Sequence, residues 1–219
     1  MELMKSIPDK HYDLAVVDPP YGLGKRVTSG AGKLKNRFAN NSDTSWDIPP
    51  TQEYFNELFR ISKNQIIWGG NYFNLPPTRS ILCWDKVQPW ENFSQFELAW
   101  TSFDAPAQLF KFQATRVGRE SKKIHPTQKP IALYTWLLSK YSKEGDTIFD
   151  SHVGSGSIRI ACHNLGLDFE GCEINPTYWE AQEEKFKEHI SQGNLFGTTR
   201  IASSKNEGCQ EKGKVNDNI

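Results

Sequence analysis

Short apolar strands that alternate with helical patterns constrain the fold of this chain more than any other feature. The clearest unit is a strand at Thr147–Asp150, a glycine turn at Gly154–Gly156, a helix, and a second strand at Asp168–Glu173. The apolar residues of the intervening helix are Ile158, Ala161, Cys162 and Leu165. Such alternation predicts an α/β fold with a mostly parallel sheet.

The rest of the chain continues this pattern and ends in a polar segment. The other strand candidates are Tyr12–Asp18, Gln65–Trp68, Ser80–Trp84 and Phe96–Trp100. The other helix candidates are Thr51–Ser62 with Thr51 as its N-cap, Gln128–Lys140, and a helix that Asn175 caps, that has Pro176 at its first position and that runs to about Ile190. We therefore expect one domain over residues 1–190 and a disordered tail over residues 191–219.

The turn from Asp150 to Ser157 can form part of a ligand pocket. Its sequence, Asp-Ser-His-Val-Gly-Ser-Gly-Ser, places two glycines between a strand and a helix N-terminus, where backbone can approach a ligand. Arg159 stands where a dinucleotide-binding fingerprint has its third glycine. Glu173 ends the next strand, where a carboxylate can accept both hydroxyl groups of a ribose. The pattern fits a nucleoside cofactor without a pyrophosphate, and taken alone it also fits a plain strand–helix turn.

A second candidate site is Asp18-Pro19-Pro20-Tyr21, directly after a buried strand. Ligands of a parallel sheet lie beyond the carboxyl ends of its strands. A planar base could stack on Tyr21 while its amino group donates to the Asp18 carboxylate and to the Pro19 carbonyl. Holding both hydrogens would favour a more pyramidal, nucleophilic nitrogen, without a metal or a covalent intermediate. The alternative interpretation is a plain turn in which the two prolines end the strand.

Basic residues gather in two stretches although the formal net charge of the chain is zero. The first stretch, residues 22–50, and the second, residues 104–124, are predicted to be loops. Their basic residues include Lys25, Arg26, Lys33, Lys35 and Arg37 in the first, and Arg116, Arg119, Lys122 and Lys123 in the second. Together they could present a positive face to a polyanion, and solvated loops are the equally weighted alternative.

Several classes of protein are disfavoured. The sequence has no apolar run long enough for a transmembrane helix and no signal-peptide pattern at its start. Its four cysteines show no C-x-x-C spacing, which argues against structural zinc and favours buried thiols in a reducing compartment. We expect a cytoplasmic protein of a bacterium or of a phage-infected cell.

Three motifs in order resemble those of the amino-methylating DNA methyltransferases. Asp18–Tyr21 resembles their catalytic motif, and Phe149–Ser157 resembles their S-adenosylmethionine motif. The segment His125–Pro130, His-Pro-Thr-Gln-Lys-Pro, is similar to the motif that closes the cofactor pocket near the methionine end. A catalytic motif that precedes the cofactor motif is the permuted order of the β-class members, many of them from phages or restriction–modification systems. The resemblance spans about residues 1–189.

This resemblance implies a Rossmann-like, seven-stranded, mostly parallel sheet with one reversed strand, and a target base flipped out of double-stranded DNA. It implies that the target base is held by Asp18, Pro19, Pro20 and Tyr21. It assigns S-adenosylmethionine to Asp150, Ser151, Gly154, Gly156, Glu173 and Asn175, with Thr127 and Lys129 near the methionine carboxylate. The two basic stretches become DNA-contacting loops whose phosphate contacts are salt-sensitive and largely blind to sequence.

The chain departs from the family pattern at three points. Ser151, His152 and Ser157 replace residues of the common Asp-Pro-Phe-x-Gly-Ser-Gly-Thr motif, and we expect His152 to pack as the aromatic residue does. The strand that usually precedes the first helix is missing, which weakens the expected pocket for the cofactor's adenine. The short chain leaves little room for a target-recognition domain, so we expect a short or loosely read site.

Adenine N6 is the favoured target, because cytosine N4 enzymes more often carry Ser-Pro-Pro-Tyr. Cytosine N4 methylation, an RNA substrate and an inactive DNA-binding relic remain alternatives. Protein glutamine methylation is disfavoured, because those enzymes usually have Asn-Pro-Pro-Tyr after the cofactor motif. Finally, Gln192, Leu195 and Phe196 form a segment that resembles the short peptides that dock on the bacterial sliding clamp, although such motifs recur by chance.

Overall fold

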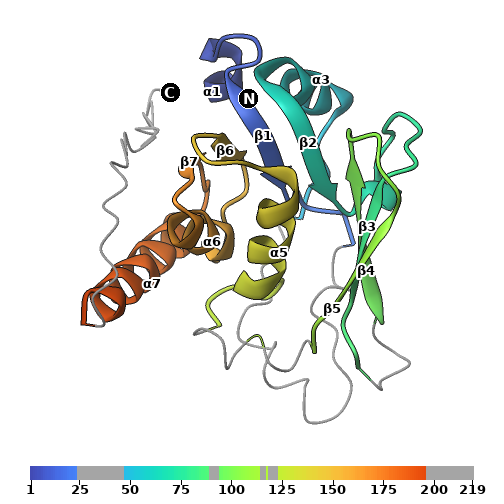
Figure 1. Ribbon diagram of the computed structural model, residues 1–219. Coiled ribbons are helices and arrows are strands. Elements are labelled where there is room, and N and C mark those ends of the chain that lie inside the picture. The colour runs from blue at the N-terminus through green and yellow to red at the C-terminus, as the bar shows by residue number, and fades with distance from the viewer. Residues whose placement is uncertain (24–46, 89–93, 114–116, 118–122, 196–219) are drawn as a thin grey trace, which may run out of the picture.

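A seven-stranded sheet forms the centre of the computed structural model, which describes residues 1–23, 47–88, 94–113, 117 and 123–195 (Figure 1). The strands lie in the order β5-β3-β4-β2-β1-β6-β7. They are β1 (Tyr12–Val17), β2 (Ser62–Trp68), β3 (Ile81–Asp85), β4 (Phe96–Thr101), β5 (Gln108–Lys111), β6 (Thr147–Asp150) and β7 (Asp168–Gly171). β4 is antiparallel to both of its neighbours, and every other pair is parallel. This confirms the predicted α/β fold with one reversed strand.

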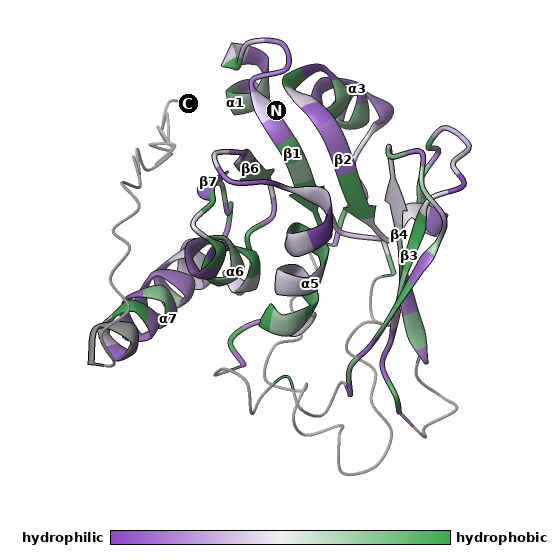
Figure 2. Cartoon of the chain, viewed as in Figure 1, coloured by the Kyte–Doolittle hydropathy of each residue, from purple (hydrophilic) through white to green (hydrophobic). Residues whose placement is uncertain are grey.

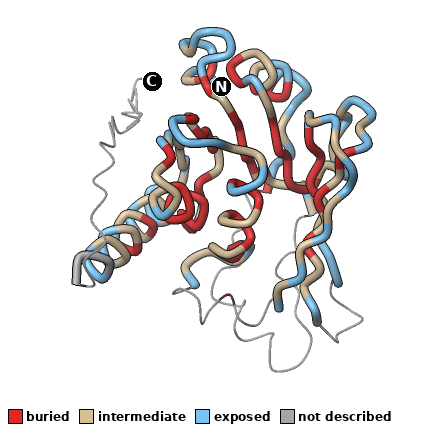
Figure 3. The backbone as a smooth tube through the Cα atoms, in the orientation of Figure 1, coloured by how far each residue is buried: buried red, intermediate tan, exposed pale blue. Residues whose placement is uncertain are grey.

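Helices cover both faces of the central strands. They are α1 (Glu2–Ser6), α3 (Gln52–Ile61), α5 (Ile131–Tyr141), α6 (Ser157–Leu165) and α7 (Pro176–Leu195), with a 3-10 turn, η3, at Gly70–Tyr72. Side chains of β1 alternate between two cores: Ala15 and Val17 pack with α3, whereas Leu14 and Val16 pack with α5. α7 lies outside α6 (Figure 1). The central strands β1 and β2 are more deeply buried than the edge strands β5 and β7 (Figure 3), and the second halves of β1 and β2 are apolar (Figure 2).

The structure corrects several predicted elements. β5 was not predicted: it lies within the expected loop 104–124, where it pairs in parallel with β3. The expected helix over Gln128–Lys140 begins only at Ile131, because Pro130 has an extended backbone and occupies the N-cap position. α7 runs to Leu195, so residues 191–195 belong to a helix and not to the predicted tail.

The two predicted helix caps have different outcomes. Thr51 is the N-cap residue of α3, but its side chain makes no capping hydrogen bond. Asn175 does cap α7: its Oδ1 accepts the backbone N–H of Thr177 at 2.9 Å, and Pro176 is the first helical residue. In the described part of the chain β7 is the edge strand beside the cofactor motif.

Candidate active site

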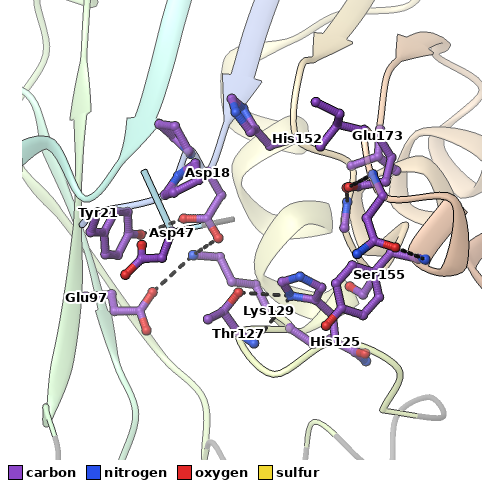
Figure 4. A pocket seen from close by; sticks show the side chains of 18 of the residues that line it. Asp18, Tyr21, Asp47, Glu97, His125, Thr127, Lys129, His152, Ser155 and Glu173 are labelled. Carbon is purple, nitrogen blue, oxygen red and sulfur yellow. Dashed lines mark hydrogen bonds and ion pairs between the residues drawn. The ribbon is translucent and has the colours of Figure 1, made fainter. Parts of the chain in front are cut away.

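The predicted site residues converge at the carboxyl ends of β1, β6 and β7, where one pocket opens (Figure 4). β4 and the segment that leads into α5 complete its wall. The lining residues are Asp18, Pro19, Pro20, Tyr21, Asp47, Glu97, His125, Thr127, Gln128, Lys129, Tyr134, His152, Val153, Gly154, Ser155, Glu173, Ile174, Asn175 and Tyr178. The catalytic and cofactor motifs, far apart in the sequence, therefore share one cavity.

Tyr21 is fixed against Asp18 and against the turn that follows β2. Its hydroxyl donates to Asp18 Oδ1 at 2.5 Å, and its ring stacks on Tyr72 at a centroid distance of 4.9 Å. Burial, followed by the charges of Asp18 and Glu97, raises the pKa of Tyr21 well above its usual value, so the phenol stays protonated. Gly69 lies directly against this ring. The aromatic platform predicted from the sequence is therefore held on one side by protein.

Lys129, which we expect near the methionine carboxylate of the cofactor, forms an ion pair with Asp18. Its Nζ is 2.5 Å from Asp18 Oδ2 and 3.1 Å from Glu97 Oε2, and its side chain is only 2% exposed. Burial by itself would lower the pKa of Lys129, but the Asp18 and Glu97 carboxylates outweigh it and raise that pKa. The ammonium group therefore stays charged next to the residue predicted to hold the target base.

Glu97 extends this cluster to a second lysine. Its Oε1 is 2.5 Å from Nζ of Lys86, which follows β3. Burial would raise the pKa of Glu97, but Lys129 and Lys86 outweigh that effect and lower the pKa to about 2. Charges thus alternate along the series Asp18, Lys129, Glu97 and Lys86, drawn in part in Figure 4. A glutamate within an otherwise apolar strand was the sequence signal for this residue, and the motif-based analysis missed it.

The glycine turn after β6 is tied to Glu173. The Gly154 N–H donates to Glu173 Oε2 and the Asn175 N–H donates to Glu173 Oε1, each at 2.9 Å. Gly154 and Gly156 have φ values of +52° and +69°, a conformation that favours glycine. A Cβ atom on Gly156 would lie 3.0 Å from Oε1 of Gln182 on α7. Both glycines therefore serve the left-handed backbone of this turn, and Gly156 also allows its close packing against α7.

Three of the predicted cofactor residues lie behind the pocket wall. Asp150, Ser151 and Gly156 do not line the cavity of the described structure. Asp150 is 2% exposed and accepts the His152 N–H at 2.9 Å, and burial raises the pKa of Asp150 to about 8. These residues shape the turn, whereas Gly154, Glu173, Asn175 and Thr127 line the pocket itself.

His152 packs edge-on against Tyr54 of α3, at a centroid distance of 5.6 Å, as expected for a replacement of an aromatic residue. Ser151 Oγ lies 2.6 Å from the Tyr54 hydroxyl and 2.9 Å from His152 Nδ1. Burial lowers the pKa of His152 to about 4, so the ring is neutral at pH 7. The departures at positions 151 and 152 thus form one hydrogen-bonded group with Tyr54.

Elsewhere in the pocket wall, His125 connects the segment before α5 to α7. Its ring meets that of Tyr178 at 4.4 Å, and its Nδ1 lies 3.0 Å from Thr127 Oγ1. Burial lowers the pKa of His125 to about 4. The sequence analysis gave His125 no role of its own, and it also missed Asp47, Tyr134 and Ile174, which line the pocket.

Most predicted DNA-contacting residues lie outside the described residues. These are Lys25, Arg26, Lys33, Lys35, Arg37, Arg116, Arg119 and Lys122, and Phe196 of the clamp-like segment lies outside as well. Lys123 is described and exposed. Among the described residues there is no cluster of His, Cys, Asp and Glu that could hold a metal ion, and no helix long and apolar enough to span a membrane.

Comparison with known proteins agrees with this geometry. A family model described as DNA methylase matches residues 84–184. The type II methyltransferase M.HpaI of Haemophilus parainfluenzae is 36% identical over 226 residues, which cover 84% of this chain and 71% of that protein. The type II methyltransferase M.BglII of Bacillus subtilis is 21% identical, over 90% of this chain and 69% of that protein.

Solved structures show the same fold. M1.HpyAVI in complex with SAM matches with a TM-score of 0.54 and 18% identity, over 84% of this chain and 94% of that chain. PvuII DNA methyltransferase, described as cytosine-N4-specific, matches with a TM-score of 0.57 and 13% identity, over 88% of each chain. On the evidence of the sequence relationship to M.HpaI and of the family model, this chain belongs to the amino-methylating DNA methyltransferases of restriction–modification type.

Proposed function

We propose that the enzyme transfers a methyl group from S-adenosylmethionine to N6 of an adenine that is flipped out of double-stranded DNA. The observation that carries this proposal is that Asp18 and Pro19 line the same pocket as the glycine turn and Glu173. The two groups that would accept the hydrogens of the exocyclic amine therefore lie beside the residues that would bind the nucleoside part of the cofactor. Asp18, in place of the serine more common in cytosine N4 enzymes, favours adenine.

The pocket residues fit S-adenosylmethionine. Each Glu173 oxygen accepts one backbone N–H and keeps lone pairs for a ribose hydroxyl. Ile174 is 91% exposed at the pocket wall, where its apolar side chain could pack against a planar group of the cofactor. The cofactor, when bound, supplies an electrophilic methyl group on a sulfonium centre. Thr127, on the segment that leads into α5, remains our candidate for its methionine end.

The protein's own task is to hold and orient the amine. The Asp18 carboxylate and the Pro19 carbonyl accept its two N–H groups, which withdraws the nitrogen lone pair from the ring. The Asp18 carboxylate is also the nearest acceptor for the proton that the amine loses. The Tyr21 ring stacks on Tyr72 and also lines the pocket, where it can stack on the base. Residues 22–50 and residues 104–124, the second of which contains β5, are the segments that we expect to contact DNA phosphates.

Nucleoside mass spectrometry on DNA incubated with the enzyme and S-adenosylmethionine tests the proposed function. N6-methyldeoxyadenosine is the expected product. N4-methyldeoxycytidine would keep the family and overturn the base, and no methylated nucleoside from several DNA sources would favour RNA as substrate or an inactive relic. A folded sample with measured cofactor binding is the control that separates the last two.

Replacing Ile174 with serine is expected to weaken S-adenosylmethionine binding about fivefold. Losing part of the apolar contact area of one side chain corresponds to roughly 1 kcal/mol. Because Ile174 is exposed, the melting temperature should stay unchanged. Isothermal titration calorimetry measures the affinity, and Leu109→Ser, at a 55% exposed leucine on β5, is the matched control. Equal affinities for both variants would remove Ile174 from the cofactor pocket.

A separate proposal concerns the end of α7. Gln192 and Leu195 lie in its last turn, next to Phe196, and we propose that this segment docks on a bacterial sliding clamp. A double variant, Leu195→Ala/Phe196→Ala, should lose retention on immobilised clamp and keep full methylation of short DNA duplexes. If the double variant is retained as well as the unaltered enzyme, the segment has no such role.

A further inference from the structure

The structure assigns to Glu97 the role of a positioning residue that acts on Asp18 through the buried ammonium group of Lys129. This inference rests on the proposed function of Asp18 as the acceptor for the target amine. Neither the catalytic motif nor the cofactor motif contains Glu97. It comes from β4, the reversed strand of the sheet, and reaches the pocket beside Tyr21 (Figure 4).

Charged and aromatic side chains enclose Lys129. Its ammonium group lies between two carboxylates, 2.5 Å from Asp18 Oδ2 and 3.1 Å from Glu97 Oε2. Apolar and aromatic surface surrounds the rest of the side chain: the Trp68 ring centroid lies 5.2 Å from Nζ, and that of Tyr21 lies 6.0 Å away. Because the exposed fraction of Lys129 is only 2%, the two carboxylates, and not water, fix its position.

The net charge of this cluster determines the field at the target amine. Asp18 and Lys129 alone would form a neutral pair, and the field of Asp18 at the target amine would be largely cancelled. Glu97 adds one negative charge, so Asp18, Lys129 and Glu97 together carry a net charge of −1. The amine becomes positive as it is methylated, and a preorganised negative environment stabilises that charge. Lys129 thus orients the Asp18 carboxylate, while the negative charge of Glu97 offsets that of Lys129. The negative field of Asp18 at the target amine is therefore preserved.

The far end of the series differs from the buried centre. The Lys86 side chain is 18% exposed, compared with 24% for Glu97 and 2% for Lys129, and its Nζ lies 5.3 Å from the Trp84 ring centroid. Lys86 contacts Glu97 and stands one step farther along the series from Asp18, so at Asp18 its charge offsets that of Glu97 only in part. The other titratable groups that face Asp18, Lys129 and Glu97 are Tyr21, Tyr54, Tyr134, His125, His152 and Asp150. The three tyrosines stay protonated and the two histidines stay neutral near pH 7.

The first test is Glu97→Gln, which keeps the shape of the side chain and removes its charge. We expect kcat to fall roughly 10- to 100-fold with KM for S-adenosylmethionine nearly unchanged. Without Glu97 the pKa of Lys129 falls, because one close opposite charge is lost. Lys129 then loses its proton at lower pH, and the alkaline limb of the kcat profile moves to lower pH. Asp150, with a pKa near 8, titrates in both proteins.

A readout independent of activity is the NMR titration of Lys129 in protein labelled at its lysine side chains. Lys129 should remain protonated throughout the alkaline range in the unaltered enzyme and titrate at lower pH in Glu97→Gln. The matched control is Glu53→Gln, which removes a carboxylate from an exposed ion pair with Lys5 on the opposite face of the sheet. It should leave both the titration and the rate unchanged. An identical Lys129 titration in Glu97→Gln would overturn the inference.

A double-mutant cycle tests whether Glu97 acts through Lys129. Lys129→Met leaves two carboxylates without their shared cation, so they compete for a proton. Adding Glu97→Gln restores a net charge of −1 at Asp18, and the double variant should therefore be faster than Lys129→Met alone. Independent, multiplicative losses would contradict the proposal. The rate is measured as methyl groups transferred to DNA, whichever base receives them. The NMR titration tests the action of Glu97 on Lys129 even if no methylated nucleoside forms.

Discussion

Asp18→Ala is expected to lower the rate of methyl transfer by about 1000-fold or more and to leave the affinity for S-adenosylmethionine within about threefold. The variant removes the carboxylate that we propose accepts from the target amine and that accepts from the Tyr21 hydroxyl. Lys129 keeps Glu97 as a partner, so no buried charge is left unpaired and the fold should persist. Single-turnover methyl transfer and calorimetric cofactor binding measure the two quantities.

Asp18→Asn is the matched variant for the same position. It keeps an acceptor oxygen but loses the negative charge, and we expect a rate between those of the unaltered enzyme and of Asp18→Ala. The difference between the two variants separates the hydrogen bond of Asp18 from its charge. If Asp18→Ala instead abolished cofactor binding with the fold intact, Asp18 would belong to the cofactor site and its assigned role would be wrong.

Gly69→Ala should reduce the rate of methyl transfer on the order of 100-fold through the position of Tyr21. A Cβ atom on Gly69 would lie 2.2 Å from Tyr21 Cε1, and the ring cannot retreat freely because Tyr72 stacks on it. A displacement of about 1 Å at a positioned group is enough for a loss of this size. The backbone of Gly69 is also left-handed, with φ +68°, which costs an alanine about 1–2 kcal/mol.

Gly166→Ala provides the matched control, because Gly166 has the same φ of +68° and a Cβ atom there would meet nothing within 4 Å. Both variants should lose similar stability from backbone strain, and thermal unfolding measures that loss. Only Gly69→Ala adds the collision with Tyr21, so only it should lose activity beyond the effect of stability. Equal rates for the two variants would show that the position of Tyr21 does not limit the reaction.

Local patterns were sufficient for most of the fold and for the place of the site. The apolar run of β1 ending at Asp-Pro-Pro and the two glycines after β6 each predict a strand that stops at the carboxyl edge of a parallel sheet. β5 could not be predicted, because its four residues include only Leu109 and Phe110 as apolar residues and its pairing partner, β3, is distant in the chain. Such a short segment has too little periodicity to separate a strand from a loop.

The sequence by itself determined that Asp18 and Glu173 stand at strand ends and that the catalytic motif precedes the cofactor motif. Only the tertiary structure decided what surrounds Asp18. The motif placed Lys129 near a pocket, but a long, flexible side chain takes its direction from the charges that it meets. Those charges are Asp18 after β1 and Glu97 on β4, which the strand order brings together. Long-range ion pairs of this kind follow from topology, because a buried ammonium group must find carboxylates wherever the fold supplies them.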